Sequence, residues 1–257
     1  MSAPVSVAFD QTRSRAAFTL FHEKGNIITA EMVDALRAGL EAIADNPHLK
    51  LITIAGAGSD FSFGASIPEH APDRIRDVLP AMHRLVHDLL DAPAVTAAVV
   101  RGRCLGGGFE LALACDFIFA ADDAVFGLPE VALGVFPPAA SALLPLRIGA
   151  ARATRAIVTG ESRSAAEWHE AGLIAFLART DALDTQVDRW FAEHVAPRSA
   201  AALRYATAAA RTGLVARVRE ALPELERLYL DDLMQTQDAV EGIAAFMDRR
   251  APQWKNR

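Results

Sequence analysis

The sequence predicts an α/β fold followed by a helical C-terminal region. Up to residue 121, apolar runs too short for helices alternate with longer segments of helical periodicity, which is typical of parallel strands joined by crossover helices. After Pro145, apolar stripes at three- and four-residue steps dominate. The chain has 257 residues, 52% of them hydrophobic, so it can bury one sizeable core or two small ones, and its composition excludes intrinsic disorder.

The first predicted elements are a hairpin, a helix and a buried strand. Two apolar runs, 5–9 and 16–21, flank the polar segment DQTRSR and are expected to pair as strands. Apolar residues recur at helical spacing over 30–46, and Pro47 ends that segment. The continuous apolar run 51–55 indicates a strand buried on both faces.

A second cycle of helices and strands follows. The pattern predicts a helix over 73–91, a strand over 94–100, a helix over 109–115 and a strand over 117–121. The sequence RGRCLGGG is expected to be the turn between the first of these strands and the helix after it.

The C-terminal residues form helices that cannot be stable alone. Their apolar stripes need a surface to cover, either the first part of the chain or a neighbouring subunit. The stripes comprise Leu222, Leu225, Leu228, Val240, Ile243, Phe246 and Met247. We therefore expect a core over residues 1–195 and a helical region for packing and oligomerisation over 196–257.

Charge and cysteine content exclude several function classes. The formal net charge is −6 and the pI is about 5.7, so no overall basic field would attract nucleic acid or an anionic membrane. Cys104 and Cys115 are the only cysteines and are not spaced as a CxxC motif, which favours a reducing compartment and no zinc site. The first twenty residues lack the pattern of a secretory signal, and no apolar stretch is long enough to span a bilayer. We expect a cytoplasmic protein.

Three consecutive glycines, Gly106, Gly107 and Gly108, lie between a predicted strand and a predicted helix. They allow a sharp turn and the close approach of another group, and the free N–H groups at the helix start favour an anion or oxyanion. A tight turn without a ligand explains the glycines equally well. A phosphate-binding P-loop is disfavoured because no Gly-Lys-Ser/Thr sequence follows.

Two isolated carboxylates lie in apolar sequence, Glu110 in FELALAC and Glu130 in FGLPEVALGVFPP. Burying a carboxylate is costly, so each is either salt-bridged or exposed, or else held for function with a raised pKa. Such a pair could take and give a proton beside a carbonyl group. A third segment, FSFGASI at residues 61–67, could present a backbone N–H to a ligand oxygen just before an expected helix start at Pro68.

In combination, the segments FSFGASI and CLGGGFELALACDFIFAADDAVFGLPEVALGVFP resemble the crotonase superfamily, the enoyl-CoA hydratases and isomerases. The resemblance covers nearly the whole chain, including the GLI segment at residues 172–174 and the terminal FMDRRAPQW. It implies a spiral of repeated β-β-α units with a C-terminal helical region that mediates trimers, often stacked as dimers of trimers. It also implies an acyl-CoA thioester substrate, with neither a metal nor a separate cofactor.

The same resemblance assigns roles to single residues. The backbone N–H groups of Ala65 and Gly107, each flanked by a further glycine (Gly64 and Gly106), would polarise the thioester carbonyl. Glu110 would activate the water, and Glu130 would protonate the α carbon. Family isomerases commonly keep only the second glutamate, so the presence of both favours hydration.

The resemblance also points to residues that would bind the rest of the substrate. Phe246 and Arg249 would contact the adenine and phosphates of coenzyme A, although a solvated helix end explains them as well. Phe63, Ser66 and Phe136 depart from the usual pattern and are expected to reshape the acyl pocket. Together with the PPAAS segment they resemble hydratases of cyclic dienoyl-CoA thioesters from anaerobic aromatic-ring degradation.

Other functions remain open at this point. His83, His87 and Asp91 recur every four residues and could hold a metal, but a solvated helix face is the favoured interpretation. Serine hydrolase chemistry is unsupported because no GxSxG motif is present. Within the superfamily, an isomerase, a hydrolase or a decarboxylase could use the same oxyanion hole, and a non-catalytic oligomeric binding protein is a further alternative.

Overall fold

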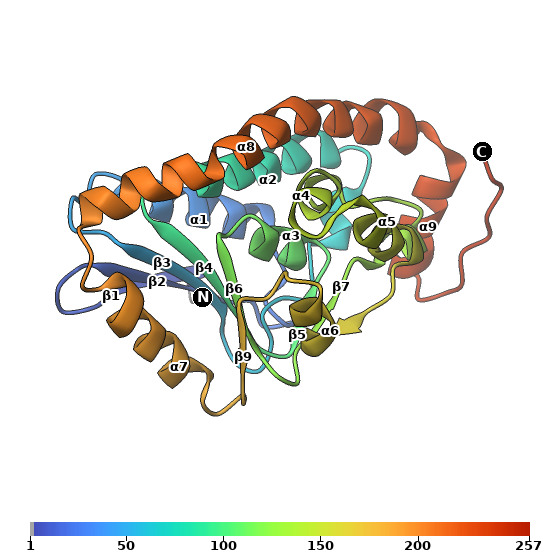
Figure 1. Ribbon diagram of the computed structural model, residues 1–257. Helices are drawn as coiled ribbons and strands as arrows, with labels where there is room; N and C mark the ends of the chain where they lie inside the picture. Colours follow the sequence, from blue (N-terminus) through green and yellow to red (C-terminus); the bar gives the residue numbers. More distant parts are fainter. Residues whose placement is uncertain (1–2) are drawn as a thin grey trace.

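The computed structural model describes residues 3–257 and contains two β-sheets flanked by helices (Figure 1). The six-stranded main sheet has the order β1-β2-β3-β4-β6-β9, and a three-stranded sheet has the order β5-β7-β8. The strands are β1 (Val5–Phe9), β2 (Arg15–Leu20), β3 (Leu51–Gly56), β4 (Val95–Val100), β5 (Arg103–Leu105), β6 (Phe117–Ala121), β7 (Val125–Gly127), β8 (Arg163–Ser164) and β9 (Phe176–Ala178).

Strand pairing in the main sheet is parallel after the first hairpin. Strands β1 and β2 pair antiparallel, with Val5 opposite Leu20, which confirms the predicted hairpin. From β2 to β9 every neighbouring pair is parallel. Parallel neighbours need crossover connections, and the helices supply them.

The chain forms a spiral because it passes repeatedly from the main sheet to the small sheet and then into a helix. It passes from β4 in the main sheet to β5 in the small sheet and then into a helix, and it repeats this with β6 and β7. An isolated parallel bridge between Ser62 and Cys104 places residue 62 beside the small sheet in the same way after β3. The expected spiral of β-β-α units is thereby confirmed.

The α-helices cover both sheets, and the longest of them, α8, runs across the top of the molecule over α2 in Figure 1. It packs against α2 and α4. No helix within residues 3–257 is long and apolar enough to cross a membrane. The helices are α1 (Ala30–Ile43), α2 (Ile75–Leu90), α3 (Gly107–Leu113), α4 (Pro138–Ile148), α5 (Ala150–Thr159), α6 (Ala165–Glu170), α7 (Leu183–Trp190), α8 (Ala200–Arg227) and α9 (Gln237–Met247).

Shorter helical turns connect these elements. Three are 3₁₀ turns and two are π-helical turns. They are η1 (Ile67–His70), η2 (Pro129–Leu133), η3 (Phe191–Val195), η4 (Leu228–Asp232) and η5 (Leu233–Gln235).

Three sequence-based expectations are corrected. The segment RGRCLGGG is not only a turn, because its residues 103–105 form β5 and pair with β7. Helix α3 begins at Gly107 rather than Phe109, so two of the three glycines lie within it. The C-terminal half also contains β8 and β9, which are two and three residues long and too short to give a period-two pattern.

The apolar core has two parts. The larger cluster lies between the sheets and the helices and includes Phe18, Leu36 and Phe119. A second, smaller cluster joins Ile75 and Leu79 of α2 to the C-terminal elements η4, η5 and α9, where it includes Tyr229, Met234 and Ile243. The C-terminal region is therefore packed on the first part of the same chain.

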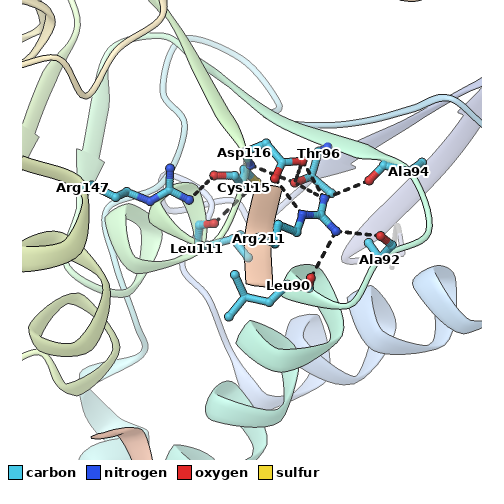
Figure 2. Close-up of polar contacts among 9 residues, drawn as sticks. All are labelled: Leu90, Ala92, Ala94, Thr96, Leu111, Cys115, Asp116, Arg147 and Arg211. Carbon is cyan, nitrogen blue, oxygen red and sulfur yellow. Dashed lines mark hydrogen bonds and ion pairs between the residues drawn. The ribbon is translucent and has the colours of Figure 1, made fainter. Parts of the chain in front are cut away.

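Arg211 of α8 links the C-terminal region to the main sheet through polar contacts (Figure 2). Its side chain is 6% exposed, and its Nε donates to Oδ1 of Asp116 at 2.7 Å. Its Nη1 donates to the carbonyl oxygen of Ala92 at 2.7 Å and its Nη2 to that of Ala94 at 2.9 Å. Asp116, which directly precedes β6, also accepts the Thr96 backbone N–H of β4 at 2.8 Å. This network therefore joins α8 to β4, to the loop before β4 and to the start of β6.

We predict that Arg211→Met will lower the free energy of unfolding by about 3–5 kcal/mol, because it leaves the Asp116 carboxylate without its partner. The control is Arg219→Met on the same helix, whose pair with Asp91 is half exposed on both sides and should contribute only about 0–1 kcal/mol. Urea denaturation of both variants measures the difference. Equal losses would show that the buried pair does not anchor α8.

Candidate active site

The glycine turn and the FSFGASI segment lie in direct contact. Ala65 forms an isolated parallel bridge with Ile28, in which Ile28 N–H donates to the Gly64 carbonyl and Ser66 N–H donates to the Ile28 carbonyl. A Cβ placed on Gly107 would lie 3.1 Å from the Ala65 Cβ and 3.3 Å from the Ala65 nitrogen. The two residues that were expected to form the oxyanion hole are thus neighbours.

Both backbone N–H groups are available to a ligand. The bridge to Ile28 uses the Gly64 carbonyl and the Ser66 N–H, so the Ala65 N–H takes no part in it. Gly107 is the first residue of α3, and an N–H at this position has no acceptor within its helix. The positive end of the helix dipole adds to the attraction for a negatively charged oxygen.

Glycine is required here by close approach and backbone conformation. Gly106 has a φ of 49°, and a Cβ on it would lie 2.8 Å from Oε1 of Glu130. A Cβ on Gly108 would lie 2.6 Å from the Ser62 Cβ. Any side chain at these positions would therefore displace the glutamate or the FSFGASI segment.

Glu110 is held by the start of a second helix. It lies in the first turn of α3, is 7% exposed, and its Oε1 accepts the Ala140 backbone N–H of α4 at 2.9 Å. Burial raises the pKa of Glu110 to about 7, and the N–H groups of Ala140 and Ala139 partly oppose that rise. Those N–H groups favour the charged form, so Glu110 is the carboxyl group of the pair that is favoured to carry the negative charge.

Glu130 lies in η2 and faces Glu110. Its Oε2 is buried and has no hydrogen-bond partner within residues 3–257. Burial, together with the charge of Glu110, raises the pKa of Glu130 to about 8. The two carboxyl groups therefore titrate as a coupled pair, and the Ala140 N–H that Glu110 accepts favours the proton on Glu130.

A cavity of about 970 Å³, the outer chamber, opens beside these residues. It lies between the FSFGASI segment, the glycine turn, η2 and the end of α9. A narrower inner chamber of about 50 Å³ contains both glutamates and is closed by Phe136, Tyr229 and side chains of α2. Ala65, Gly107 and Glu130 line both chambers and lie where the two meet.

The expected site residues divide between these chambers. The outer chamber is lined by Phe63, Gly64, Ser66, Gly106, Phe246 and Arg249. Glu110 and Phe136 line the inner chamber. Phe63 is 43% exposed and lies under the Arg103 guanidinium, so of the two bulky phenylalanines only Phe136 narrows the inner chamber. Gly108 lines neither chamber and instead packs on Ser62.

Sequence reasoning missed three residues of the site. His70 lines both chambers, and its Nδ1 donates to the Ser66 carbonyl at 2.9 Å. Tyr229 lines the inner chamber and Lys24 the outer one. His70 could have been noticed because it closely follows FSFGASI, but Tyr229 lies about a hundred residues after either glutamate in an ordinary helical stripe.

His83 does not lie on a solvated helix face, as had been expected. It is 4% exposed, and its Nδ1 lies 2.6 Å from Oε2 of Glu226 on α8. The expectation failed because α8 covers this face of α2. Within residues 3–257, no group of three His, Cys, Asp or Glu side chains is placed to hold a metal ion.

The raised pKa of Glu130 predicts a pH-dependent stability. Between pH 4.5 and about 8 the unfolded chain releases a proton that the native state retains, so the free energy of unfolding falls as pH rises. Glu130→Gln removes this decrease. The free energy of unfolding of the variant, relative to that of wild type, should therefore be higher at pH 8 than at pH 5 by on the order of 2 kcal/mol. Urea denaturation at both pH values measures this, with the exposed Glu220→Gln as the control. A pH-independent difference would contradict the buried protonated state.

Several known proteins are similar to this chain. A "Cyclohexa-1,5-dienecarbonyl-CoA hydratase" from Thauera aromatica is 43% identical over 256 residues, covering 100% of this chain and 98% of that protein. A "Carnitinyl-CoA dehydratase" from Salmonella arizonae is 32% identical and covers 92% of this chain and 93% of that protein.

Solved structures show the same architecture. An enoyl-CoA hydratase from Mycobacterium avium subsp. paratuberculosis has a TM-score of 0.87 at 28% identity, with 99% of each chain covered. The family described as "Enoyl-CoA hydratase/isomerase" matches residues 16–257. This chain therefore belongs to the enoyl-CoA hydratase/isomerase family, within the crotonase superfamily.

Proposed function

We propose that this protein adds water across the double bond of an α,β-unsaturated acyl-CoA thioester, with a cyclic dienoyl group as its substrate. The observation that carries the proposal is the pair of buried carboxyl groups, Glu110 and Glu130, beside two free backbone N–H groups. Hydration needs one group to take a proton from water and another to give a proton to carbon.

The thioester carbonyl would bind between the N–H groups of Ala65 and Gly107. These donors stabilise the negative charge that develops on the carbonyl oxygen when hydroxide adds to the β carbon. Because they are fixed by the bridge to Ile28 and by α3, they need no reorganisation during the reaction. Removing one such donor typically costs about 3 kcal/mol of transition-state stabilisation.

The carboxyl groups would move the protons. Glu110, as carboxylate, takes a proton from water while the water oxygen bonds to the β carbon and the double-bond electrons pass into the thioester enolate. Glu130, protonated, then gives its proton to carbon. Transfer of the proton from Glu110 to Glu130 restores the starting state. The contacts of the two groups support this division of roles, because Glu110 accepts the Ala140 N–H, whereas Oε2 of Glu130 has no hydrogen-bond partner within residues 3–257.

The coenzyme A part would occupy the outer chamber. Lys24 and Arg249 lie on its wall with Phe246, which gives positive charge for phosphates and an aromatic face for the adenine. Arg250 is paired with Glu241 at 2.6 Å and supports the end of α9. Only the acyl group would then reach the inner chamber.

A six-membered cyclic dienoyl group is the acyl group that we propose. The inner chamber is small and is closed at its end by Phe136 and Tyr229, whose ring centroids lie 5.5 Å apart. This geometry favours a compact group over a long straight chain. The 43% identity with a cyclohexa-1,5-dienecarbonyl-CoA hydratase over the full length supports the same choice.

The alternatives have less support. A double-bond isomerase of the family needs only the carboxyl group at the Glu130 position, whereas both are buried in the site here. A hydrolase or a decarboxylase could use the same N–H pair. A non-catalytic binding protein would have no reason to bury two carboxyl groups at a cost in stability.

We also propose that residues 196–257 serve oligomerisation, as a homotrimer or a dimer of trimers. Exposed apolar side chains of this region, such as Tyr205, which is 77% exposed, and Val240, which is 46% exposed, support the existence of such contacts. A cytoplasmic location is supported by the two cysteines, which are buried and unpaired.

We predict that Glu110→Gln and Glu130→Gln will each lower the rate of water addition by about 10²- to 10⁴-fold, because each removes one proton-transfer group. The exposed Glu220→Gln is the matched control and should keep the wild-type rate. The loss of enoyl absorbance and a mass gain of one water measure the reaction. Wild-type rates in both site variants would overturn the proposed roles.

We predict a preference for a cyclic substrate. Cyclohexa-1,5-dienecarbonyl-CoA should be turned over with a kcat/KM at least about tenfold higher than that of crotonyl-CoA, because a compact ring makes more contacts in the inner chamber. Parallel assays of the two thioesters test this. A preference for crotonyl-CoA would leave a general enoyl-CoA hydratase, and no water addition to either would reject hydration of these substrates.

A further inference from the structure

The hydroxyl group of Tyr229 is buried beside the two glutamates without a partner. Tyr229 is 1% exposed, lines the inner chamber, and its hydroxyl has no hydrogen-bond partner within residues 3–257. Buried phenol groups normally find a partner, because leaving one unpaired costs the energy of desolvating it. A partner is therefore expected to come from the ligand.

The backbone places Tyr229 in this position by a local irregularity. Helix α8 ends at Arg227 and continues as the π-helical turn η4, after which α9 begins at Gln237. Tyr229 and Leu230 of that turn are both buried in the smaller apolar cluster. Single π-helical turns occur frequently at functional sites.

The surroundings keep the phenol neutral. Burial raises the pKa of Tyr229 well above its ordinary value, and negative charge on the Glu110–Glu130 pair raises it further. The Phe136 and Tyr229 rings pack in an edge-to-face arrangement at a centroid distance of 5.5 Å. Tyr229 therefore presents an O–H donor to the space next to the proton-transfer pair.

We propose that the Tyr229 hydroxyl is a third polar contact of the acyl site and donates a hydrogen bond to the oxygen atom that is added to the substrate. This inference rests on the proposed function, in which that oxygen comes from water and becomes the hydroxyl of the product. Glu110 accepts the proton of the water, and Tyr229 fixes the position of its oxygen. The site should therefore bind ligands that carry a hydroxyl on the β carbon more tightly than ligands that lack it.

Two unreactive ligands test this contact without turnover. Benzoyl-CoA and 2-hydroxybenzoyl-CoA differ only by a hydroxyl at the ring carbon that corresponds to the β position. The wild-type protein should bind the hydroxylated ligand about 5- to 10-fold more tightly, the effect of one hydrogen bond. Tyr229→Phe should abolish the preference while keeping the affinity for benzoyl-CoA, because the ring and its packing remain.

The chain offers a matched control in its only other tyrosine, Tyr205, which is 77% exposed on α8. Tyr205→Phe should keep the preference, and isothermal titration calorimetry measures all the affinities. With cyclohexa-1,5-dienecarbonyl-CoA, Tyr229→Phe should lower kcat at least about fivefold with little change in KM, whereas a structural role would shift the melting temperature instead.

The outcomes separate the two proposals. If wild-type protein and Tyr229→Phe show the same preference, or if wild type shows none, the Tyr229 contact is wrong. Wild type could instead add water to neither cyclohexa-1,5-dienecarbonyl-CoA nor crotonyl-CoA, while its preference for 2-hydroxybenzoyl-CoA depends on the Tyr229 hydroxyl. In that case the contact between Tyr229 and a ligand hydroxyl stands and the proposed reaction fails.

Discussion

The close approach of two backbone segments is the constraint on which the rest of the structure depends. The glycine turn and the FSFGASI segment touch so tightly that a single Cβ on Gly106 or Gly108 would collide with Glu130 or Ser62. This contact sets the Ala65 and Gly107 N–H groups side by side at the junction of two chambers. Because backbone N–H groups form this oxyanion hole, the sequence specifies it through glycines, which leave room for the close approach.

A second constraint follows from burying two carboxyl groups in the same small space. Burial raises both pKa values, and the N–H groups at the start of α4 favour the charge on Glu110. The cost in stability is offset elsewhere, for example by the Arg211–Asp116 network that ties α8 to the sheet. The same helix leads into η4, so the anchor also positions the wall of the inner chamber.

Much of this could be predicted from the sequence, because the signals are local. Strands β1 to β4 and helices α1 and α2 follow from apolar periodicity, and the crotonase resemblance follows from contiguous segments around Gly107 and Ala65. The strands β5, β8 and β9 are too short to give a period. Tyr229 and the burial of His83 depend on how a distant helix packs, and nothing in the local sequence encodes that contact.

The infrared frequency of a bound thioester carbonyl tests the central claim most directly. Benzoyl-CoA labelled with ¹³C at its carbonyl is unreactive and would place that group between the Ala65 and Gly107 N–H groups. Two hydrogen bonds weaken the C=O bond, so the account predicts a band at lower frequency in the complex than in water. A band at the solution frequency or above it would show that the carbonyl is not held by this N–H pair and would contradict the account.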